Sequence, residues 1–301
     1  MTLSQRLRAM LALGRVSNLP TCVSNVLVGV GVAAGDMSQA WSTPVLICLL
    51  SVVLLYVGGM VLNDAVDAPR DAIERANRPI PRGDISRTTA FWIAGVLLVG
   101  GFGLSLLLGP PAVVTCATLV AAIVAYDVLH KRFAWATPLM GICRALVYFY
   151  ATVTISCGFD WLRMTPAALA ILAYVTLVTI AARREAKPGA RGPTGVAALL
   201  MAVSLAPAIW LRPASWRHAL IAAAVLVSWQ LYLVWIARSA LSSPVAAGAP
   251  PRAARVIGGW VAGISLLDAW LLALLGSPQL TGAALVCFAM SLIAQQRVAG
   301  S

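Results

Sequence analysis

Three carboxylates stand at helical spacing where a long apolar stretch ends. They are Asp64, Asp67 and Asp71, and Asn63 comes directly before them. Successive residues of a helix turn by about 100°, so the three side chains fall on one face. Like charges on one face repel one another unless a cation lies among them. Carboxylates with an amide suit Mg²⁺, which completes its coordination with water and substrate phosphate, and the spacing therefore predicts a Mg²⁺ site.

A rigid basic turn follows the acids and has the sequence Asn77-Arg78-Pro79-Ile80-Pro81-Arg82-Gly83. Acids for a metal followed by bases for an anion indicate a diphosphate site at a membrane surface. The alternative is a solvated loop that caps a transmembrane helix, as most charged loops do. Against that alternative, the same segment holds half of the ten acidic residues of the chain, which are Asp64, Asp67, Asp71, Glu74 and Asp84.

The composition excludes a soluble globular domain, because the chain is 60% hydrophobic and 11% charged with a mean hydropathy of +0.89. Apolar stretches long enough to cross a bilayer recur along its whole length. We therefore expect an all-α polytopic membrane protein with about ten transmembrane helices, forming one domain over residues 1–301. Residues 1–16 are predicted to be an amphipathic cytoplasmic segment. The predicted spans are 17–35, 43–64, 88–108, 111–129, 135–157, 165–182, 195–211, 217–237, 253–275 and 279–296.

The distribution of positive charge predicts the orientation. The net charge is +12, and excess Lys and Arg mark the cytoplasmic side of a membrane protein. If the predicted spans are correct, one side carries only Arg163, Arg212 and Arg217, Arg144 lies within a span, and all other bases lie on the opposite side. Both termini are then cytoplasmic, and a bacterial inner membrane is the expected location. Membrane orientation and contact with anionic lipids explain the excess of Lys and Arg over Asp and Glu, so no nucleic acid partner is needed.

Two further polar clusters fall on the predicted cytoplasmic side. The fourth span ends in Tyr126-Asp127-Val128-Leu129-His130-Lys131-Arg132, and the sixth ends in Arg183-Arg184-Glu185-Ala186-Lys187. The chemistry that fits all three clusters is ionisation of an allylic diphosphate. Mg²⁺ and basic side chains stabilise the charge that develops on the departing pyrophosphate, and a dry, aromatic-lined pocket protects the carbocation.

These motifs resemble the UbiA-type intramembrane prenyltransferase family. The resemblance rests on Asn63-Asp64-x-x-Asp67-x-x-x-Asp71 with the Asn77–Gly83 turn, and on Tyr126 with Lys131-Arg132. It implies helices around a central lipid-accessible cavity that opens to the cytoplasmic side, and Mg²⁺-dependent transfer of a prenyl group from a polyprenyl diphosphate to a small acceptor. It also implies the site residues. Metal and diphosphate would be held by Asn63, Asp64, Asp67 and Asp71, phosphate oxygens by Arg78, Lys131 and Arg132, and Tyr126 would lie near the reacting carbon.

The chain departs from the family pattern in two places. The family usually carries a second aspartate-rich motif after the sixth helix, where this chain has one acid, Glu185, among bases. We therefore predict one tightly held Mg²⁺, with Glu185 a weak metal ligand and Arg183, Arg184 and Lys187 sharing the diphosphate charge. The alternative is that these bases only follow the positive-inside rule. The family has nine helices, and residues 276–301 add another. Both departures resemble the EboC subgroup of the family. The resemblance suggests a cyclitol-like alcohol as the acceptor. It implies no particular protein partner.

Several polar residues within the predicted spans are open to more than one interpretation. Arg144 is deep enough to be costly unless it is paired or functional, so it either pairs with Asp268 or reaches the diphosphate as a catalytic group. Asn18 and Asn25 are candidate acceptor contacts in the cavity, although Asn25 could equally join packed helices. Asp127 either ends its helix or accepts a proton from an alcohol acceptor beside Tyr126.

Three other functions compete with prenyl transfer. A terpene-cyclase-like enzyme would ionise the same diphosphate and capture the cation internally, using the same residues. A transporter would place ionisable groups near the midplane on repeated halves, whereas these acids gather at one surface and the motif does not recur. A catalytically silent homologue is the third, because the second acidic motif is altered.

Overall fold

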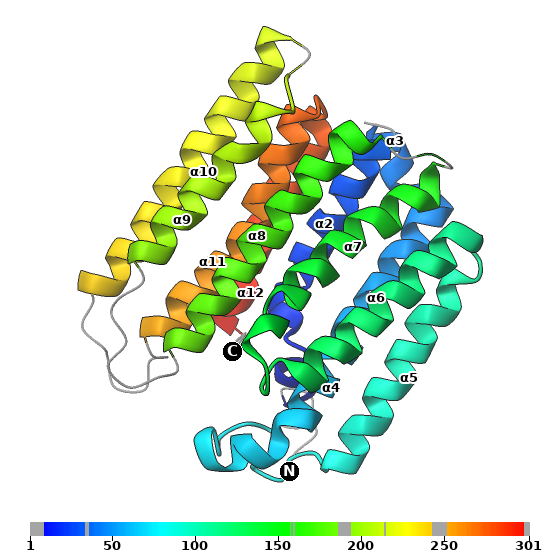
Figure 1. The fold of residues 1–301 in the computed structure, drawn as a ribbon, viewed down its shortest axis with the longest axis vertical. Coiled ribbons are helices and arrows are strands. Elements are labelled where there is room, and N and C mark those ends of the chain that lie inside the picture. The colour runs from blue at the N-terminus through cyan, green and yellow to red at the C-terminus, as the bar shows by residue number, and fades with distance from the viewer. Residues whose placement is uncertain are drawn as a thin grey trace.

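The computed structural model describes residues 9–33, 36–156, 158, 160–185, 194–213, 215–242 and 252–297, and every regular element in these ranges is a helix (Figure 1). The long elements are α2 (Leu19–Ala33), α4 (Thr43–Glu74), α5 (Arg87–Ser105), α6 (Pro110–Leu129), α7 (Pro138–Ile155), α8 (Trp161–Glu185), α9 (Thr194–Leu205), α10 (Trp216–Ser242), α11 (Arg252–Leu274) and α12 (Pro278–Arg297). Short elements are η1 (Val16–Asn18), α3 (Met37–Ala40), η2 (Ala134–Ala136) and η3 (Ala206–Ile209).

Nine helices within the described ranges are long and apolar enough to cross a membrane. They confirm the predicted all-helical membrane fold, and nine of the ten predicted spans coincide with one of them. The span predicted at 195–211 is different, because there α9 gives way to the 3₁₀ helix η3 at Ala206. Pro207 lies at this point and has no N–H to continue an α-helical ladder. The resulting apolar segment, Gly195–Ile209, is shorter than a spanning helix.

The helices lie side by side in one bundle with α2 and α11 near its centre (Figure 1). Most of α11 is buried, including the large side chains of Trp260 and Trp270. The outer helices instead expose apolar side chains, among them Trp92 and Val96 on α5 and Leu231 on α10. An apolar outer surface around a packed interior is what lipid-facing helices require, because the bilayer core satisfies no polar group.

Helix α4 extends beyond its neighbours at the lower end of Figure 1 and carries the acidic motif. It reaches Glu74 and is therefore longer than the predicted span 43–64. Pro69 lies inside it and cannot donate to the carbonyl of Ala65. Nε of Arg87, at the start of α5, donates to that oxygen at 2.9 Å. Because Arg87 satisfies the freed carbonyl, the helix continues past the proline and presents three acids at helical spacing.

A close contact fixes α2 against α7, two helices that line the site described below. A Cβ on Gly29 would lie 2.6 Å from the carbonyl oxygen of Tyr148, so only glycine permits this approach. The Thr152 hydroxyl donates to the Gly29 carbonyl at 3.0 Å across the same contact. Small residues at such crossings let helix backbones pack closely in a membrane.

Candidate active site

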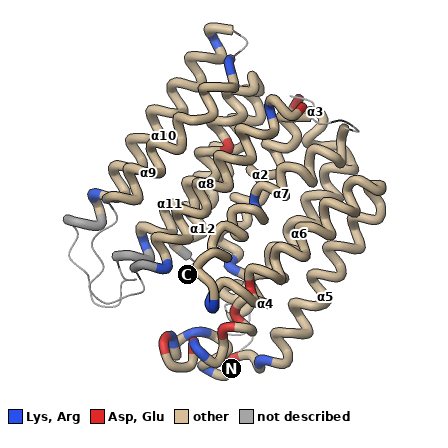
Figure 2. The backbone as a smooth tube through the Cα atoms, viewed as in Figure 1, with Lys and Arg blue, Asp and Glu red and all other residues tan. Residues whose placement is uncertain are grey.

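The acidic motif lies at the end of the bundle where charged residues gather (Figure 2). Its side chains are buried, and the four residues are Asn63, Asp64, Asp67 and Asp71. One helical face carries all three acids as predicted, but a rise of about 1.5 Å per residue separates the first and last by roughly 10 Å along the axis. The acids are therefore distributed along the face: Asp64 and Asp71 share one basic partner, and Asp67 has others.

The basic turn folds back so that Arg78 lies between two of the acids. Its Nη1 is 3.0 Å from Oδ1 of Asp64 and 2.7 Å from Oδ2 of Asp71. Arg15 approaches Asp64 from the other side, with Nη2 at 3.7 Å from the same oxygen. Burial acts to lower the pKa of Arg15, but the attraction of Asp64 and weaker nearby charges outweigh it and the pKa is raised. Two cations thus neutralise this pair of carboxylates.

The third acid, Asp67, faces the end of α6. Its Oδ2 lies 3.2 Å from Nζ of Lys131 and 3.7 Å from Nε2 of His130. The His130 ring stacks on Tyr126 with centroids 4.5 Å apart, and its Nδ1 lies 2.8 Å from the Tyr126 carbonyl oxygen. Since a carbonyl only accepts, Nδ1 carries a proton there. His130 therefore links the predicted metal ligand Asp67 to the predicted reaction centre at Tyr126.

Asp127 has one engaged and one free carboxylate oxygen. Oδ1 accepts a hydrogen bond from Nδ2 of Asn63 at 3.1 Å. Oδ2 is buried and has no hydrogen-bond partner, a costly arrangement for a carboxylate unless a ligand completes it. The residue lines an internal cavity next to Tyr126. A buried, unpaired oxygen beside a cavity is suited to accept a proton from a bound group.

A large cavity of about 700 Å³, here called the charged cavity, opens among α4, the end of α6, the start of α7 and the end of α8. Lys and Arg outnumber Asp and Glu on its wall, so an anion is the ligand that it favours. Its charged and histidine lining residues are Arg15, Asp67, Arg70, Glu74, Arg75, Arg78, His130, Lys131 and Arg183.

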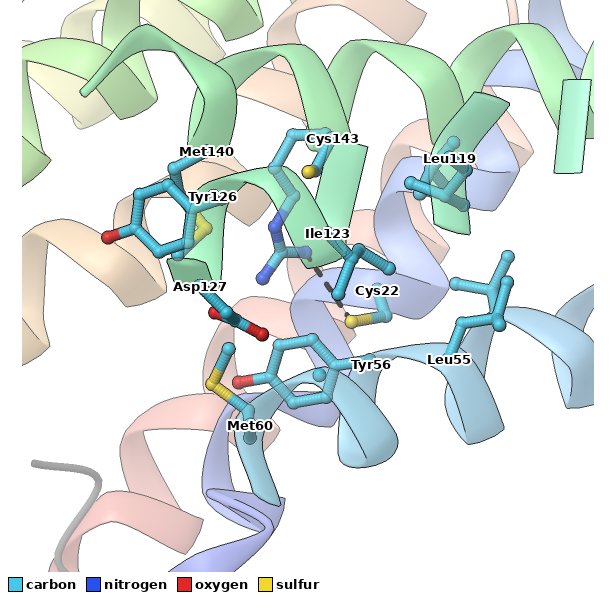
Figure 3. Close-up of a pocket in the computed structure, with 14 residues that line it drawn as sticks. Cys22, Leu55, Tyr56, Met60, Leu119, Ile123, Tyr126, Asp127, Met140 and Cys143 are labelled. Carbon is cyan, nitrogen blue, oxygen red and sulfur yellow. Dashed lines mark hydrogen bonds between the residues drawn. The ribbon is translucent and has the colours of Figure 1, made fainter. Parts of the chain in front are cut away.

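A smaller cavity of about 60 Å³, the inner cavity, lies next to it (Figure 3). Met60, Tyr126 and Met140 line both cavities and form the boundary between them. The other lining residues of the inner cavity are Cys22, Val52, Leu55, Tyr56, Gly59, Leu119, Ile123, Asp127, Cys143, Arg144 and Val147. A polar, cationic chamber beside an apolar one matches a ligand with an anionic head and an apolar tail.

Arg144 and Asp268 are joined through Asn25 rather than by direct contact. Nη1 of Arg144 donates to Oδ1 of Asn25 at 2.8 Å, and Nδ2 of Asn25 donates to Oδ2 of Asp268 at 2.8 Å. Ser24 and Tyr148 also donate to Asp268. Asn25 lines neither cavity, so these contacts support its helix-packing interpretation, while Arg144 still borders the inner cavity.

Other predicted residues have different surroundings. Asn18 lines neither cavity and accepts from Gln295 on α12 at 3.0 Å. Arg132 is exposed and is absent from the wall of the charged cavity. Lys187 lies outside the described residues, as do the side chains of Arg184 and Glu185 at the end of α8.

Four basic residues in the cavity wall, Arg15, Arg70, Arg75 and His130, were not predicted as site residues. Arg15 precedes the first span and His130 lies between two predicted residues, but neither forms a motif in the sequence. Arg183, in the basic run that ends α8, was predicted to share the diphosphate charge, and it lines the charged cavity. The fold adds that its guanidinium donates to the carbonyl of His130 at 2.5 Å.

The residues present fit a Mg²⁺ site, although the described side chains do not form a closed metal cluster. No three His, Cys, Asp or Glu residues within the described ranges converge as ligands. The donors on α4 are carboxylate and amide oxygens, which Mg²⁺ prefers. Oδ1 of Asp71 is buried without a hydrogen-bond partner, so it is available to a cation. A Mg²⁺ ion held by both Asp64 and Asp71 would take the place of the Arg78 guanidinium that lies between them.

The fold defines an integral membrane protein, with a cationic cavity beside an apolar one at one end of its helical bundle. Comparison with known sequences places it more narrowly. The chain belongs to the UbiA prenyltransferase family, whose model matches residues 22–192. This match covers the acidic motif, the end of α6 and the basic run after α8.

Individual relatives agree with this assignment. The digeranylgeranylglyceryl phosphate synthase of Methanoculleus marisnigri is 31% identical over 174 residues, 58% of this chain and 59% of that protein. The match thus spans about three fifths of that relative. A UbiA homologue from Archaeoglobus fulgidus bound to GPP and Mg²⁺ shares the fold with a TM-score of 0.60 at 13% identity, over 89% of this chain and 99% of that one. The apo UbiA homologue from Aeropyrum pernix K1 gives 0.57 at 18% identity, over 90% and 96%.

Proposed function

We propose that this protein transfers a prenyl group from a prenyl diphosphate to a small acceptor in a Mg²⁺-dependent reaction. The observation that carries the proposal is the contact between a cationic chamber and an apolar one, with Tyr126 at their boundary and Asp127 beside it in the wall of the apolar one. Membership of a prenyltransferase family and a similar fold in a homologue bound to GPP and Mg²⁺ support the same chemistry.

The diphosphate of the donor would lie in the charged cavity. Lys131 and Arg183 face it from α6 and α8, and Arg15 and Arg78 from the side of α4. Asp64, Asp67, Asp71 and Asn63 would hold Mg²⁺ on that side. Bound Mg²⁺ supplies charge neutralisation for the pyrophosphate as it departs.

The reaction itself would take place at the boundary of the two cavities. The bond between C1 and the bridging oxygen breaks, and its electron pair leaves with pyrophosphate. The face of Tyr126 stabilises the allylic cation through a cation–π contact. A hydroxyl oxygen of the acceptor then bonds to C1 while Oδ2 of Asp127 takes its proton. Apolar walls around Met60 and Met140 exclude water that would otherwise capture the cation.

The acceptor and the subgroup belong to this proposal. An alcohol of the cyclitol type suits a proton-accepting Asp127. The EboC subgroup is favoured by the single acid, Glu185, that stands among bases where the family usually has a second aspartate-rich motif. We place the charged end of the bundle in the cytoplasm of a bacterial inner membrane, on the positive-inside distribution of the sequence.

Similarity to the archaeal relatives favours a second candidate. Their name suggests transfer of a geranylgeranyl group to give digeranylgeranylglyceryl phosphate, and the identity of 31% over 174 residues supports it. The two candidates differ in the length of the donor tail and in the acceptor. Both share the ionisation step and the residues that carry it out.

One experiment tests the proposal against all its competitors. Purified protein in lipid nanodiscs receives Mg²⁺ and prenyl diphosphates of graded length, with and without alcohol acceptors, and pyrophosphate and products are measured. Acceptor-dependent prenyl products support transfer, and a cyclised hydrocarbon without acceptor indicates a cyclase. Absence of pyrophosphate at every length indicates a silent homologue or a transporter.

A matched pair of variants identifies the chamber that is used. Lys131→Met removes a cation from the wall of the charged cavity, and we expect it to lower pyrophosphate release by about tenfold or more. Arg163→Met removes a cation whose only described ion pair is the half-exposed one with Asp160 outside both cavities. It should leave release unchanged. Equal effects of the two variants would contradict the proposed site.

A further inference from the structure

We propose that the donor carries a short tail of one or two isoprenyl units, and that a wall of packed side chains at the far end of the inner cavity sets this limit. The inference rests on the proposed prenyl transfer and names its donor class. The wall consists of Val52 and Leu55 on α4, Leu119 on α6 and Val147 on α7. We call these four residues the end wall.

The inner cavity has a defined entrance and a defined end. Tyr126, Met60 and Met140 form the entrance, because they also line the charged cavity. Leu55 and Leu119 lie at the opposite end of the close-up from Tyr126 and Met140 (Figure 3). A diphosphate bound among the cations of the charged cavity therefore directs its tail past Tyr126 towards the end wall.

The depth of the cavity follows from the helices that form it. Leu119 precedes Tyr126 by seven residues on α6, and Val147 follows Met140 by seven on α7. At about 1.5 Å per residue these separations are each roughly 10 Å. An extended chain advances about 1.2 Å per bond, judged from the span of an extended peptide, so an isoprenyl unit of four backbone bonds takes about 5 Å. About two units fit between entrance and end wall.

The volume gives a similar limit. The inner cavity has a volume of about 60 Å³. A cavity needs roughly 10–15 Å³ for each water that it holds, so this one holds about four to six waters, which occupy about 150 Å³ as liquid. A cavity of about that size admits benzene. One isoprenyl unit fits this space, so the volume sets the lower end of the range and the helical depth sets the upper end.

The end wall is closed by packing rather than by a loop or a mobile side chain. Leu55 and Leu119 are 1% and 2% exposed, and Val52 and Val147 are also buried, at 2% and 6%. Cys116, one turn before Leu119, is fully buried as well. A tail longer than two units would have to displace these side chains, and forcing extra methylenes into a packed core is unfavourable. The four-unit geranylgeranyl group in the name of the archaeal relatives is too long for this cavity.

A series of donors with increasing tail length tests the inference. Diphosphates with one, two, three and four isoprenyl units are compared by the kcat/KM of pyrophosphate release, and the matching non-hydrolysable thiolodiphosphates by thermal shift with Mg²⁺. We expect the protein to prefer the one- or two-unit compound over the four-unit compound by about tenfold or more in both series. Equal or better use of the four-unit compound would overturn the inference.

Substitutions of the end wall should move the preference in both directions. Leu119→Ala deepens the cavity and should raise the ratio of three-unit to two-unit activity by about tenfold, whereas Leu119→Phe shortens it and should leave only the one-unit compound bound. The Phe variant adds volume instead of leaving a void, so it tests the wall even where the Ala variant folds poorly. The same substitutions at Leu169, which is 56% exposed on α8, should leave the preference for tail length unchanged.

The outcomes separate this inference from the proposed function. If pyrophosphate is released equally from donors of every length, or if Leu119 variants do not change the preferred length, the tail limit is overturned and prenyl transfer still stands. Absence of release at every length overturns prenyl transfer. In that case the thermal shifts with thiolodiphosphates of different lengths still test the tail limit, because binding of these compounds needs no turnover.

Discussion

Replacement of Arg78 by methionine should destabilise the protein without Mg²⁺ and strengthen its affinity for Mg²⁺. Arg78 is the cation between Asp64 and Asp71, with contacts of 3.0 and 2.7 Å. Methionine keeps much of the side-chain volume but leaves two buried carboxylates with less compensation. Removing one partner of a buried ion pair costs about 3–5 kcal/mol. The side chain of Arg78 is 15% exposed, so we expect the low end, about 3 kcal/mol.

This loss is measurable as a thermal shift. At about 2 °C per kcal/mol for a chain of this size, Arg78→Met should lower the Tm of purified protein by about 6 °C in a Mg²⁺-free buffer. Added Mg²⁺ should recover most of the loss, because the vacated carboxylates bind it without displacing a guanidinium. The Kd for Mg²⁺ should fall by about tenfold, equivalent to about 1.4 kcal/mol.

A second arginine in the same turn provides the control. Arg82 is 57% exposed and pairs only with Asp84 within the described contacts. Such a surface pair contributes about 0–1 kcal/mol, so Arg82→Met should shift the Tm by about 2 °C or less and leave the Mg²⁺ affinity unchanged. The reasoning is refuted if Arg78→Met and Arg82→Met behave alike, or if Mg²⁺ stabilises Arg78→Met no more than the unmodified protein.

Three further substitutions test separate parts of the site. Asp127→Asn removes the proton acceptor, so acceptor prenylation should fall by about 10²–10⁴ while pyrophosphate release persists; a parallel loss of both would count against its role. Arg87→Leu frees the carbonyl of Ala65 and should cost about 1–3 kcal/mol in thermal unfolding. Adding Pro69→Ala supplies the missing N–H and should restore stability, and lack of rescue would refute the assignment. Asn25→Leu uncouples the buried cation and carboxylate that it joins and should cost about 3 kcal/mol or more with the tail-length preference unchanged; an altered preference would instead place the residue in the cavity.

The sequence predicted the membrane fold well because hydropathy reports burial in lipid directly. It ended the second span at residue 64, where the hydropathy of a window falls, while the helical spacing of the acids predicted a helix as far as Asp71; α4 in fact continues to Glu74. What keeps this polar helix end folded comes from elsewhere in the chain, from Arg78 and Lys131. The short helix α9 was predicted as a full span for the converse reason. Its residues are apolar, and the break at Pro207 is a backbone effect that hydropathy does not register.

The candidate site was predicted only in part. Helical spacing correctly placed Asp64, Asp67 and Asp71 on one face, because that relation is local. The spacing did not reveal which cation meets which acid. His130 reaches Asp67 only because α6 ends beside α4, and this contact depends on tertiary packing. Arg144 was predicted either to pair with Asp268 or to act on the diphosphate, and the intervening Asn25 could not be inferred from depth alone.

Titration of a prenyl thiolodiphosphate into the purified protein, followed by calorimetry with and without Mg²⁺, examines whether the acids of α4 and the bases of α6 form one diphosphate site. We predict that binding requires Mg²⁺, and that Asp67→Asn and Lys131→Met each weaken it by about tenfold or more, equivalent to at least about 1.4 kcal/mol. Binding of equal strength without Mg²⁺, or binding that neither substitution alters, would contradict a metal-assisted diphosphate site at this end of the bundle.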